Sequence, residues 1–125
     1  MRETKLLTRS EFQVMSILWN LPGQQGNTGD ILEQFEQPKP AYTTLATFLK
    51  ILHRKGFVTF RKNHNRLMFK PKVSKEEYAN IYLGPGQKAF FNDDTIEMLR
   101  FIIGNATFTA EEAANLSKLI QQRVQ

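Results

Sequence analysis

Helix-start signals recur along the chain and divide it into short segments. Three times, a residue with a side-chain hydroxyl stands three positions before a glutamate, as in Thr8 and Glu11, Ser74 and Glu77, and Thr109 and Glu112. This arrangement is a capping box, in which the hydroxyl and the carboxylate each accept a hydrogen bond from a backbone N–H at the start of a helix. Looser versions of the signal are Asn27 with Asp30, and Asp94 with Glu97.

Apolar spacing and chain breakers complete the prediction of secondary structure. Pro22 follows the first helical segment, and Gly56 is a suitable C-terminal residue for the third. Gly84-Pro85-Gly86 is expected to end a fourth helix, because proline removes a backbone donor and clashes with the preceding turn. Aromatic and apolar residues on both sides of a basic tip at 62–66 predict a hairpin. We therefore expect helices at 9–20, 28–36, 41–55, 75–83, 94–103 and 110–123, and strands at 57–61 and 67–70.

The order of these elements predicts a mainly α (α+β) fold. Three helices followed by a hairpin are typical of a winged helix-turn-helix, here with a wing sheet of two or three strands. We expect this domain over residues 1–73 and a helical dimerisation domain over residues 74–125. The later helices are short, so their apolar stripes indicate a partner chain, here a second copy in a homodimer. The expected dimerisation residues are Tyr78, Ile81, Tyr82, Ile96, Leu99, Ile103, Leu116, Leu119 and Ile120.

Positive charge is concentrated in the first domain. The chain has a net charge of +5 at pH 7, to which residues 1–73 contribute +7 and residues 74–125 contribute −2. From Lys50 to Lys72 there are eight basic residues and no acidic one. Such an asymmetry favours a polyanion as the partner of the first domain.

The helix expected at 41–55 has an apolar face and a face of hydroxyls and cations. Leu45, Phe48, Leu49 and Leu52 share the spacing of one face and should point inward. Threonine is a mediocre helix former, so threonines on the outer face indicate a role in binding. The major groove of DNA admits one helix, and a hydroxyl near its start can bond a base edge. The predicted DNA-binding residues are Tyr42, Thr43, Thr44, Thr47, Lys50 and Arg54, with Arg61, Lys62 and Arg66 at the hairpin tip. For Tyr42, packing against the helix at 28–36 is an equal alternative.

Several classes of function are disfavoured by what the chain lacks. It has no cysteine, which excludes disulfides and thiolate metal sites. His53 and His64 have no third ligand at metal spacing, and no Ser–His–Asp set is apparent, so we expect no metal, no cofactor, no catalytic residue and no enzyme. Neither a signal-peptide pattern nor a long apolar run is present, so we expect a cytoplasmic protein with no membrane insertion.

Two alternatives remain open from the residues alone. Phe90 and Phe91, which follow the Gly-Pro-Gly turn, are expected to pack across the dimer, or else to line a pocket for a small-molecule effector. A winged helix also serves some proteins as a scaffold, so a protein-interaction module is the other alternative.

Three stretches resemble the penicillinase-repressor family: FQVMSILW at 12–19, TLATFLKILHRKGFV at 44–58 and FRKNHNRLMFKPKVSKEEY at 60–78, with a weaker match at 108–120. The resemblance implies a bacterial transcriptional repressor that binds a palindromic double-stranded DNA operator as a homodimer. It also implies an antibiotic-resistance pathway, in which a membrane sensor protease responds to β-lactam and the repressor is inactivated by proteolysis in its C-terminal domain. Thr44 and Thr47 match the threonines of the family's recognition helix, and 54–56 match its basic turn into the wing.

The chain departs from the family pattern at two positions of that helix. Ala46 and Ile51 stand where the family often has arginine. A missing arginine removes a bidentate contact to guanine or phosphate, so the operator sequence does not transfer. Cleavage is expected within 84–105, although no scissile bond is evident there. The copper-responsive branch of the family uses paired cysteines, which this chain lacks.

Overall fold

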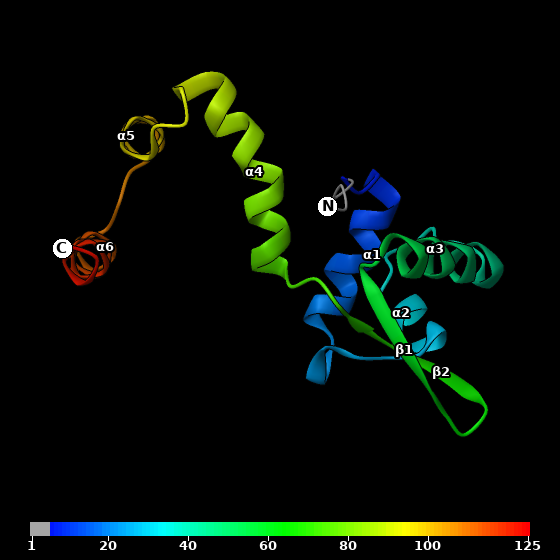
Figure 1. The fold of residues 1–125 in the computed structure, drawn as a ribbon. Coiled ribbons are helices and arrows are strands. Elements are labelled where there is room, and N and C mark those ends of the chain that lie inside the picture. The colour runs from blue at the N-terminus through cyan, green and yellow to red at the C-terminus, as the bar shows by residue number, and fades with distance from the viewer. Residues whose placement is uncertain (1–5) are drawn as a thin grey trace. The chain divides into compact units, whose positions relative to one another are not determined.

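The computed structural model describes residues 6–125, which form two compact units that divide between Leu83 and Gly84. Each unit is described by itself. The elements along the chain are α1 (Arg9–Asn20), the 3-10 turn η1 (Pro22–Gln24), α2 (Thr28–Glu33), α3 (Tyr42–Lys55), β1 (Val58–Asn63), β2 (Arg66–Pro71), α4 (Lys75–Phe91), α5 (Thr95–Gly104) and α6 (Ala110–Gln122). Figure 1 labels the α-helices and the strands.

Local capping sets the start of most helices. All three expected capping boxes are formed, at the starts of α1, α4 and α6. Asn27 and Asp30 make a fourth, with reciprocal hydrogen bonds of 2.9 and 2.8 Å. The predicted helices at 9–20 and 41–55 are confirmed, whereas α2 ends at Glu33, before the expected residue 36. Phe35 leaves the helix and is buried in the core instead.

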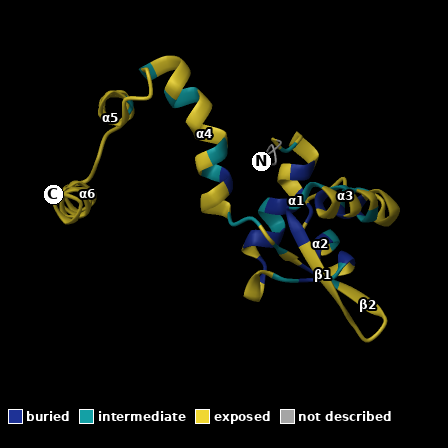
Figure 2. Ribbon diagram, in the orientation of Figure 1, coloured by how far each residue is buried: buried dark blue, intermediate teal, exposed yellow. Residues whose placement is uncertain are grey.

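The core of the first unit lies between α1, α3 and the base of the hairpin. From α1 come Val14, Met15 and Leu18, and the expected inward face of α3 supplies Leu45, Leu49 and Leu52, all fully buried. Phe48 packs against this core and is half-buried. Figure 2 shows the same division, with buried residues on one side of α3 and exposed residues on the other. The apolar spacing of α3 thus orients the helix, because burying the leucines removes one face from water and leaves the opposite face exposed.

The wing is a two-stranded antiparallel hairpin. Its register pairs Phe60 with Phe69 and Lys62 with Leu67, and the turn contains only His64 and Asn65. The strands therefore extend into the segment expected to be a five-residue tip. His64 has a φ of 59°, a left-handed conformation that closes the tight turn. A single bridge joins Gly26 to Phe69, so the third strand of the wing sheet is reduced to one residue.

The fourth helix does not end at Gly84-Pro85-Gly86, and that prediction was wrong. Helix α4 is continuous from Lys75 to Phe91. The φ of proline suits a helix, so Pro85 costs one backbone hydrogen bond and a steric adjustment rather than the helix itself. Packing on both sides supports the continuation, because Tyr78 is buried in the first unit and Phe91 contacts Phe101 in the second. The two units divide within α4, between Leu83 and Gly84.

Tyr78 belongs to the first unit's core and not to an exposed dimerisation surface. It is only 3% exposed and its ring lies near those of Phe12, Trp19 and Phe57. The backbone N–H of Leu7 donates a hydrogen bond to its hydroxyl at 2.8 Å. The expectation that Tyr78 meets a partner chain is corrected, because α4 begins inside the first unit's packing.

The second unit exposes most of its apolar surface. Helices α5 and α6 contain no buried residue, and Ile96, Leu99 and Leu119 are among their exposed side chains. Phe90 is 82% exposed, whereas Phe91 lies 5.5 Å from Phe101 between ring centroids. Surfaces of this kind mark contacts with other molecules. Within residues 6–125, no helix is both long enough and apolar enough to cross a membrane.

Candidate nucleic-acid interface

The outer face of α3 carries the residues predicted to contact DNA, and all of them are exposed: Tyr42, Thr43, Thr44, Thr47, Lys50 and Arg54. Tyr42 is 57% exposed, which favours an outward orientation, available to a ligand, over packing against α2. The N-cap residue Ala41 provides no side-chain hydrogen bond to the first turn of α3. The backbone N–H groups there remain as donors for an external acceptor, and the helix dipole makes this end positive.

The hydroxyl of Thr47 is held by the helix itself. Its Oγ1 donates a hydrogen bond to the backbone carbonyl of Thr43, at 3.0 Å. A hydroxyl has one donor and two acceptor positions, so Thr47 presents acceptor lone pairs and a methyl group outward. In the major groove these groups suit the amino group of adenine or cytosine, and the methyl group of thymine.

Lys55 points away from this face, into the body of the first unit. Its Nζ lies 2.7 Å from Oε1 of Glu11, which is buried at the start of α1. Burial on its own would raise the pKa of Glu11, but hydrogen bonds from Lys55 and from the backbone N–H and hydroxyl of Thr8 outweigh it, so the pKa lies below its ordinary value. Within the basic turn 54–56, Arg54 is exposed, whereas Lys55 and Gly56 are half-buried.

The cations of the wing lie on both faces of the hairpin. Arg61 is paired with Met68 and Lys62 with Leu67, and successive residues of a strand point to opposite faces. Lys62 therefore shares a face with Phe60 and Phe69, and Arg61 lies on the other. All three predicted wing cations, including Arg66, are exposed. The hairpin thus presents cations on both of its faces.

A cleft of about 480 Å³ lies between α3, the start of α2 and the wing. It brings together three predicted site residues, Tyr42, Lys50 and Arg66. The other polar residues of its lining, Asn27, Thr28 and Asn65, were not predicted as site residues from the sequence. In a helix-turn-helix, the helix before the recognition helix crosses the DNA backbone. In this chain that helix is α2, so the general geometry of the motif could have identified the start of α2 as part of the interface.

Positive charge on this surface is not neutralised by neighbouring carboxylates. Within residues 6–125, the ion pairs are Lys55 with Glu11 and Arg100 with Glu97. The exposed cations of α3 and of the wing take part in neither. Binding of such a surface to nucleic-acid phosphates is favourable, because each contact releases a counterion from the nucleic acid.

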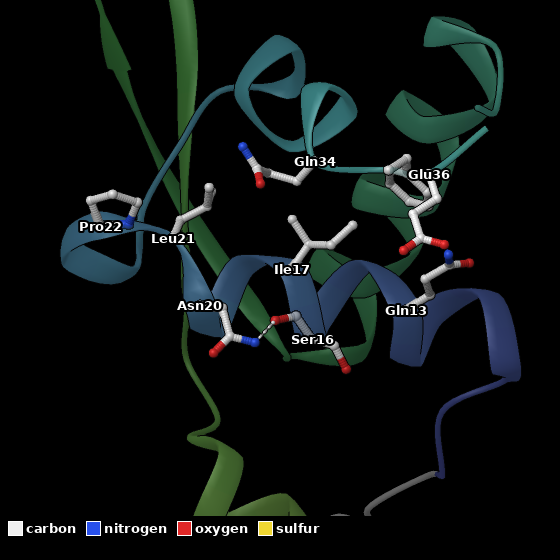
Figure 3. Close-up of a pocket in the computed structure, with 9 residues that line it drawn as sticks. Gln13, Ser16, Ile17, Asn20, Leu21, Pro22, Gln34 and Glu36 are labelled. Atoms are coloured by element: carbon white, nitrogen blue, oxygen red, sulfur yellow. Dashed lines mark hydrogen bonds between the residues drawn. The ribbon is translucent and has the colours of Figure 1, made fainter. Parts of the chain in front are cut away.

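A second hollow, of about 580 Å³, lies away from these residues, beside α1 and η1. Figure 3 shows Gln13, Asn20 and Gln34 at its walls with Ile17 between them, and Asn20 donates a hydrogen bond to the Ser16 carbonyl at 2.8 Å. None of the predicted DNA-binding residues lines it. This hollow is therefore separate from the candidate interface.

Comparisons with known proteins identify a matching family and a similar solved structure. The model of a family described as "Penicillinase repressor" matches residues 7–122. Among solved structures, the chain is similar to HlyU from Vibrio cholerae N16961, with 23% identity over 63% of this chain and 79% of that chain, and a TM-score of 0.43. Comparison with curated proteins finds no match.

Proposed function

This chain belongs to the penicillinase repressor family, whose members are DNA-binding transcriptional regulators, and we propose that it represses transcription as a homodimer on a palindromic operator. The observation that carries the proposal is the outer face of α3, where Thr43, Thr47 and Lys50 are exposed while the leucines of the opposite face are buried. Such a helix enters the major groove with hydroxyls toward the bases.

Phosphate contacts come from residues around the recognition helix. Lys50 and Arg66 line the cleft between α3 and the wing, so a backbone phosphate there meets two cations. Arg54 lies one turn beyond Lys50, and Lys62 extends along the wing. Contacts of this kind set the register of the protein on the duplex, whereas Thr47 reads the sequence.

Dimerisation is the role that we propose for the second unit. The expected dimer residues of this unit, among them Ile96, Leu99, Leu119 and Ile120, are exposed on α5 and α6, whereas Ile81 and Tyr82 belong to the first unit. Covering this apolar surface with a second copy stabilises both subunits at roughly 25 cal/mol per Å² of apolar area removed from water. Two recognition helices related by a two-fold axis then read the two halves of a palindrome.

Derepression by proteolysis after a β-lactam-type signal, through a membrane sensor protease pathway, is the mode of control that we propose on family grounds. Within the expected region 84–105, the helices α4 and α5 are separated by an exposed turn at Asn92 and Asp93. Cleavage there removes α5 and α6 and with them most of the dimer surface. An immunoblot of cells exposed to a β-lactam should show a shortened chain; derepression with a chain of unchanged mass would argue against this route.

A salt titration tests the DNA-binding proposal. The logarithm of the affinity for a duplex should fall linearly with the logarithm of salt concentration, with a slope of about −0.9 for each phosphate neutralised. Lys50→Gln should make the slope shallower, because it removes one cation from the interface. Lys88→Gln, the same change on α4 in the second unit, is the matched control and should leave the slope unchanged. An affinity for DNA that is independent of salt would refute the role of the basic face.

A further inference from the structure

An apolar groove of about 590 Å³ lies in the first unit between α1 and the first turns of α4, away from the DNA-binding face. Phe12, Trp19, Tyr78 and Tyr82 line it, and we call it the aromatic groove. Its volume is within the range of small-molecule sites in proteins, about 300–1,000 Å³. None of the predicted DNA-binding residues contributes to it.

The rings of the aromatic groove form a continuous chain of contacts. Tyr78 lies at the centre, with its ring centroid 6.0 Å from Phe12, 6.3 Å from Trp19 and 6.2 Å from Tyr82. Tyr78 and Trp19 are buried, which makes them a rigid floor, whereas Phe12 and Tyr82 are 46% and 60% exposed. Offset and edge-to-face contacts between rings are favourable. A further flat ring can therefore stack against the exposed rings of Phe12 and Tyr82.

The floor is held in place by polar contacts that a ligand need not disturb. The Trp19 indole N–H donates to the Val73 carbonyl at 3.0 Å, and the Leu7 N–H donates to the Tyr78 hydroxyl at 2.8 Å. Both buried polar groups therefore have partners within the protein. An apolar ligand can cover these rings without leaving a buried polar group unsatisfied.

The charged residues that line the aromatic groove are both basic. Arg9, in the first turn of α1, and Lys75, in the first turn of α4, belong to its lining, and among the described residues that lining includes no carboxylate. Neither cation takes part in an ion pair within residues 6–125. The groove thus combines apolar ring surfaces with positive charge at its polar positions.

We propose that the aromatic groove is a binding site for a small anionic aromatic molecule, such as an aryl carboxylate. The aromatic part stacks on the rings of Phe12 and Tyr82 over the floor, and the carboxylate accepts charge-assisted hydrogen bonds from Arg9 or Lys75. This inference does not depend on DNA binding, because the groove shares no residue with the recognition helix or the wing.

The probe for this site is 2-naphthoate, with the neutral 2-naphthamide as its isosteric partner. Trp19 is the chain's only tryptophan, so its indole N–H gives a single NMR cross-peak that reports on the floor of the groove. Titration of the full chain with 2-naphthoate should shift this cross-peak with saturation, at a Kd of about 1 mM or tighter. The amide should bind about tenfold more weakly, because it loses the charge-assisted contact.

Variants with matched charge changes locate the carboxylate. The double variant with Arg9→Gln and Lys75→Gln should bind the naphthoate about as weakly as the amide. The control with Lys88→Gln and Lys118→Gln removes the same charge from the second unit and should bind it as the unchanged chain does. Both pairs are exposed positions, so neither should prevent folding.

Four results would overturn the proposal. Equal affinity for the acid and the amide would show that the cations take no part. An equal loss in the two double variants would show that only net charge matters. A Trp19 cross-peak that does not move at the highest probe concentration would show that the groove does not bind such ligands. A cross-peak that shifts when the protein concentration is raised without probe would assign the groove to a second copy of the chain.

Discussion

Lys55 Nζ lies 2.7 Å from Glu11 Oε1, and this pair links the last turn of α3 to the first turn of α1. The same carboxylate oxygen accepts a hydrogen bond from the backbone N–H of Thr8 at 3.0 Å. The start of α1 and the end of α3 thus share one acceptor. The contact helps to hold α3 in the orientation that exposes Thr47 and Lys50.

Replacing Lys55 should destabilise the first unit. In Lys55→Met the largely buried carboxylate of Glu11 loses its cation, and breaking a buried pair in this way costs about 3–5 kcal/mol, with the lower end expected because Lys55 is partly exposed. Chemical denaturation followed by Trp19 fluorescence measures this loss, because the only tryptophan lies in the first unit. Lys72→Met is the control, because Lys72 is exposed and forms no ion pair within residues 6–125, and it should change stability by about 0.5 kcal/mol or less. Equal effects would contradict a structural role for the pair.

The stability of the first unit should also depend on pH through Glu11. The pKa of Glu11 is lower in the folded protein than in the unfolded chain, so its contribution is fully present above the ordinary glutamate value of about 4.3 and is lost as the pH falls through the folded value. The difference in unfolding free energy between the unchanged chain and Glu11→Gln should therefore shrink below about pH 4.3. A difference that stays constant down to pH 2 would rule out the lowered pKa.

Glu77 requires a control in that experiment. Its pKa is also lowered, by hydrogen bonds from the backbone N–H and the hydroxyl of Ser74, and it changes stability in the same direction with pH. Glu77→Gln measures this second contribution separately. The Glu11 effect should persist in the Glu77→Gln background.

Thr47 should matter for sequence discrimination and not for general affinity. Thr47→Val keeps the shape and a methyl group but removes the acceptor lone pairs, so it should weaken operator binding by about tenfold, or about 1.4 kcal/mol, with little change for random duplexes. Lys62→Gln removes a cation and should weaken both about equally. Fluorescence anisotropy, with an operator selected from random duplexes, measures the two ratios. A Thr47→Val protein with unchanged discrimination would remove this residue from base reading.

Charge placed on the exposed stripe of α6 should separate the proposed dimer. Leu119→Lys puts a cation into the contact, where it must be desolvated without a partner, so sedimentation should show monomers. Operator affinity should fall as well, because each monomer reads only one half-site. Gln121→Lys adds the same charge on the opposite side of α6 and is the control. A dimer that persists in Leu119→Lys would show that another surface joins the subunits.

Local signals explain why so much of the fold followed from the sequence. A capping box requires two residues three positions apart, and every box predicted at Thr8, Ser74 and Thr109 forms. The apolar spacing of α3 likewise needs only a few turns of helix to define which face is buried. The winged helix, the outward threonines and the exposed wing cations were predictable because they depend on such short-range patterns.

The sequence alone determined where the helices start, which face of α3 is buried and where positive charge gathers. Only the tertiary structure decided that α4 continues through Pro85, that Tyr78 is a core residue, and that Lys55 turns inward to Glu11. The reason is physical: these outcomes depend on partners far away in the sequence, and packing on both sides of a helix can outweigh a local breaker. The aromatic groove belongs to the same class, since its rings come from α1 and α4, which only the folded chain brings together.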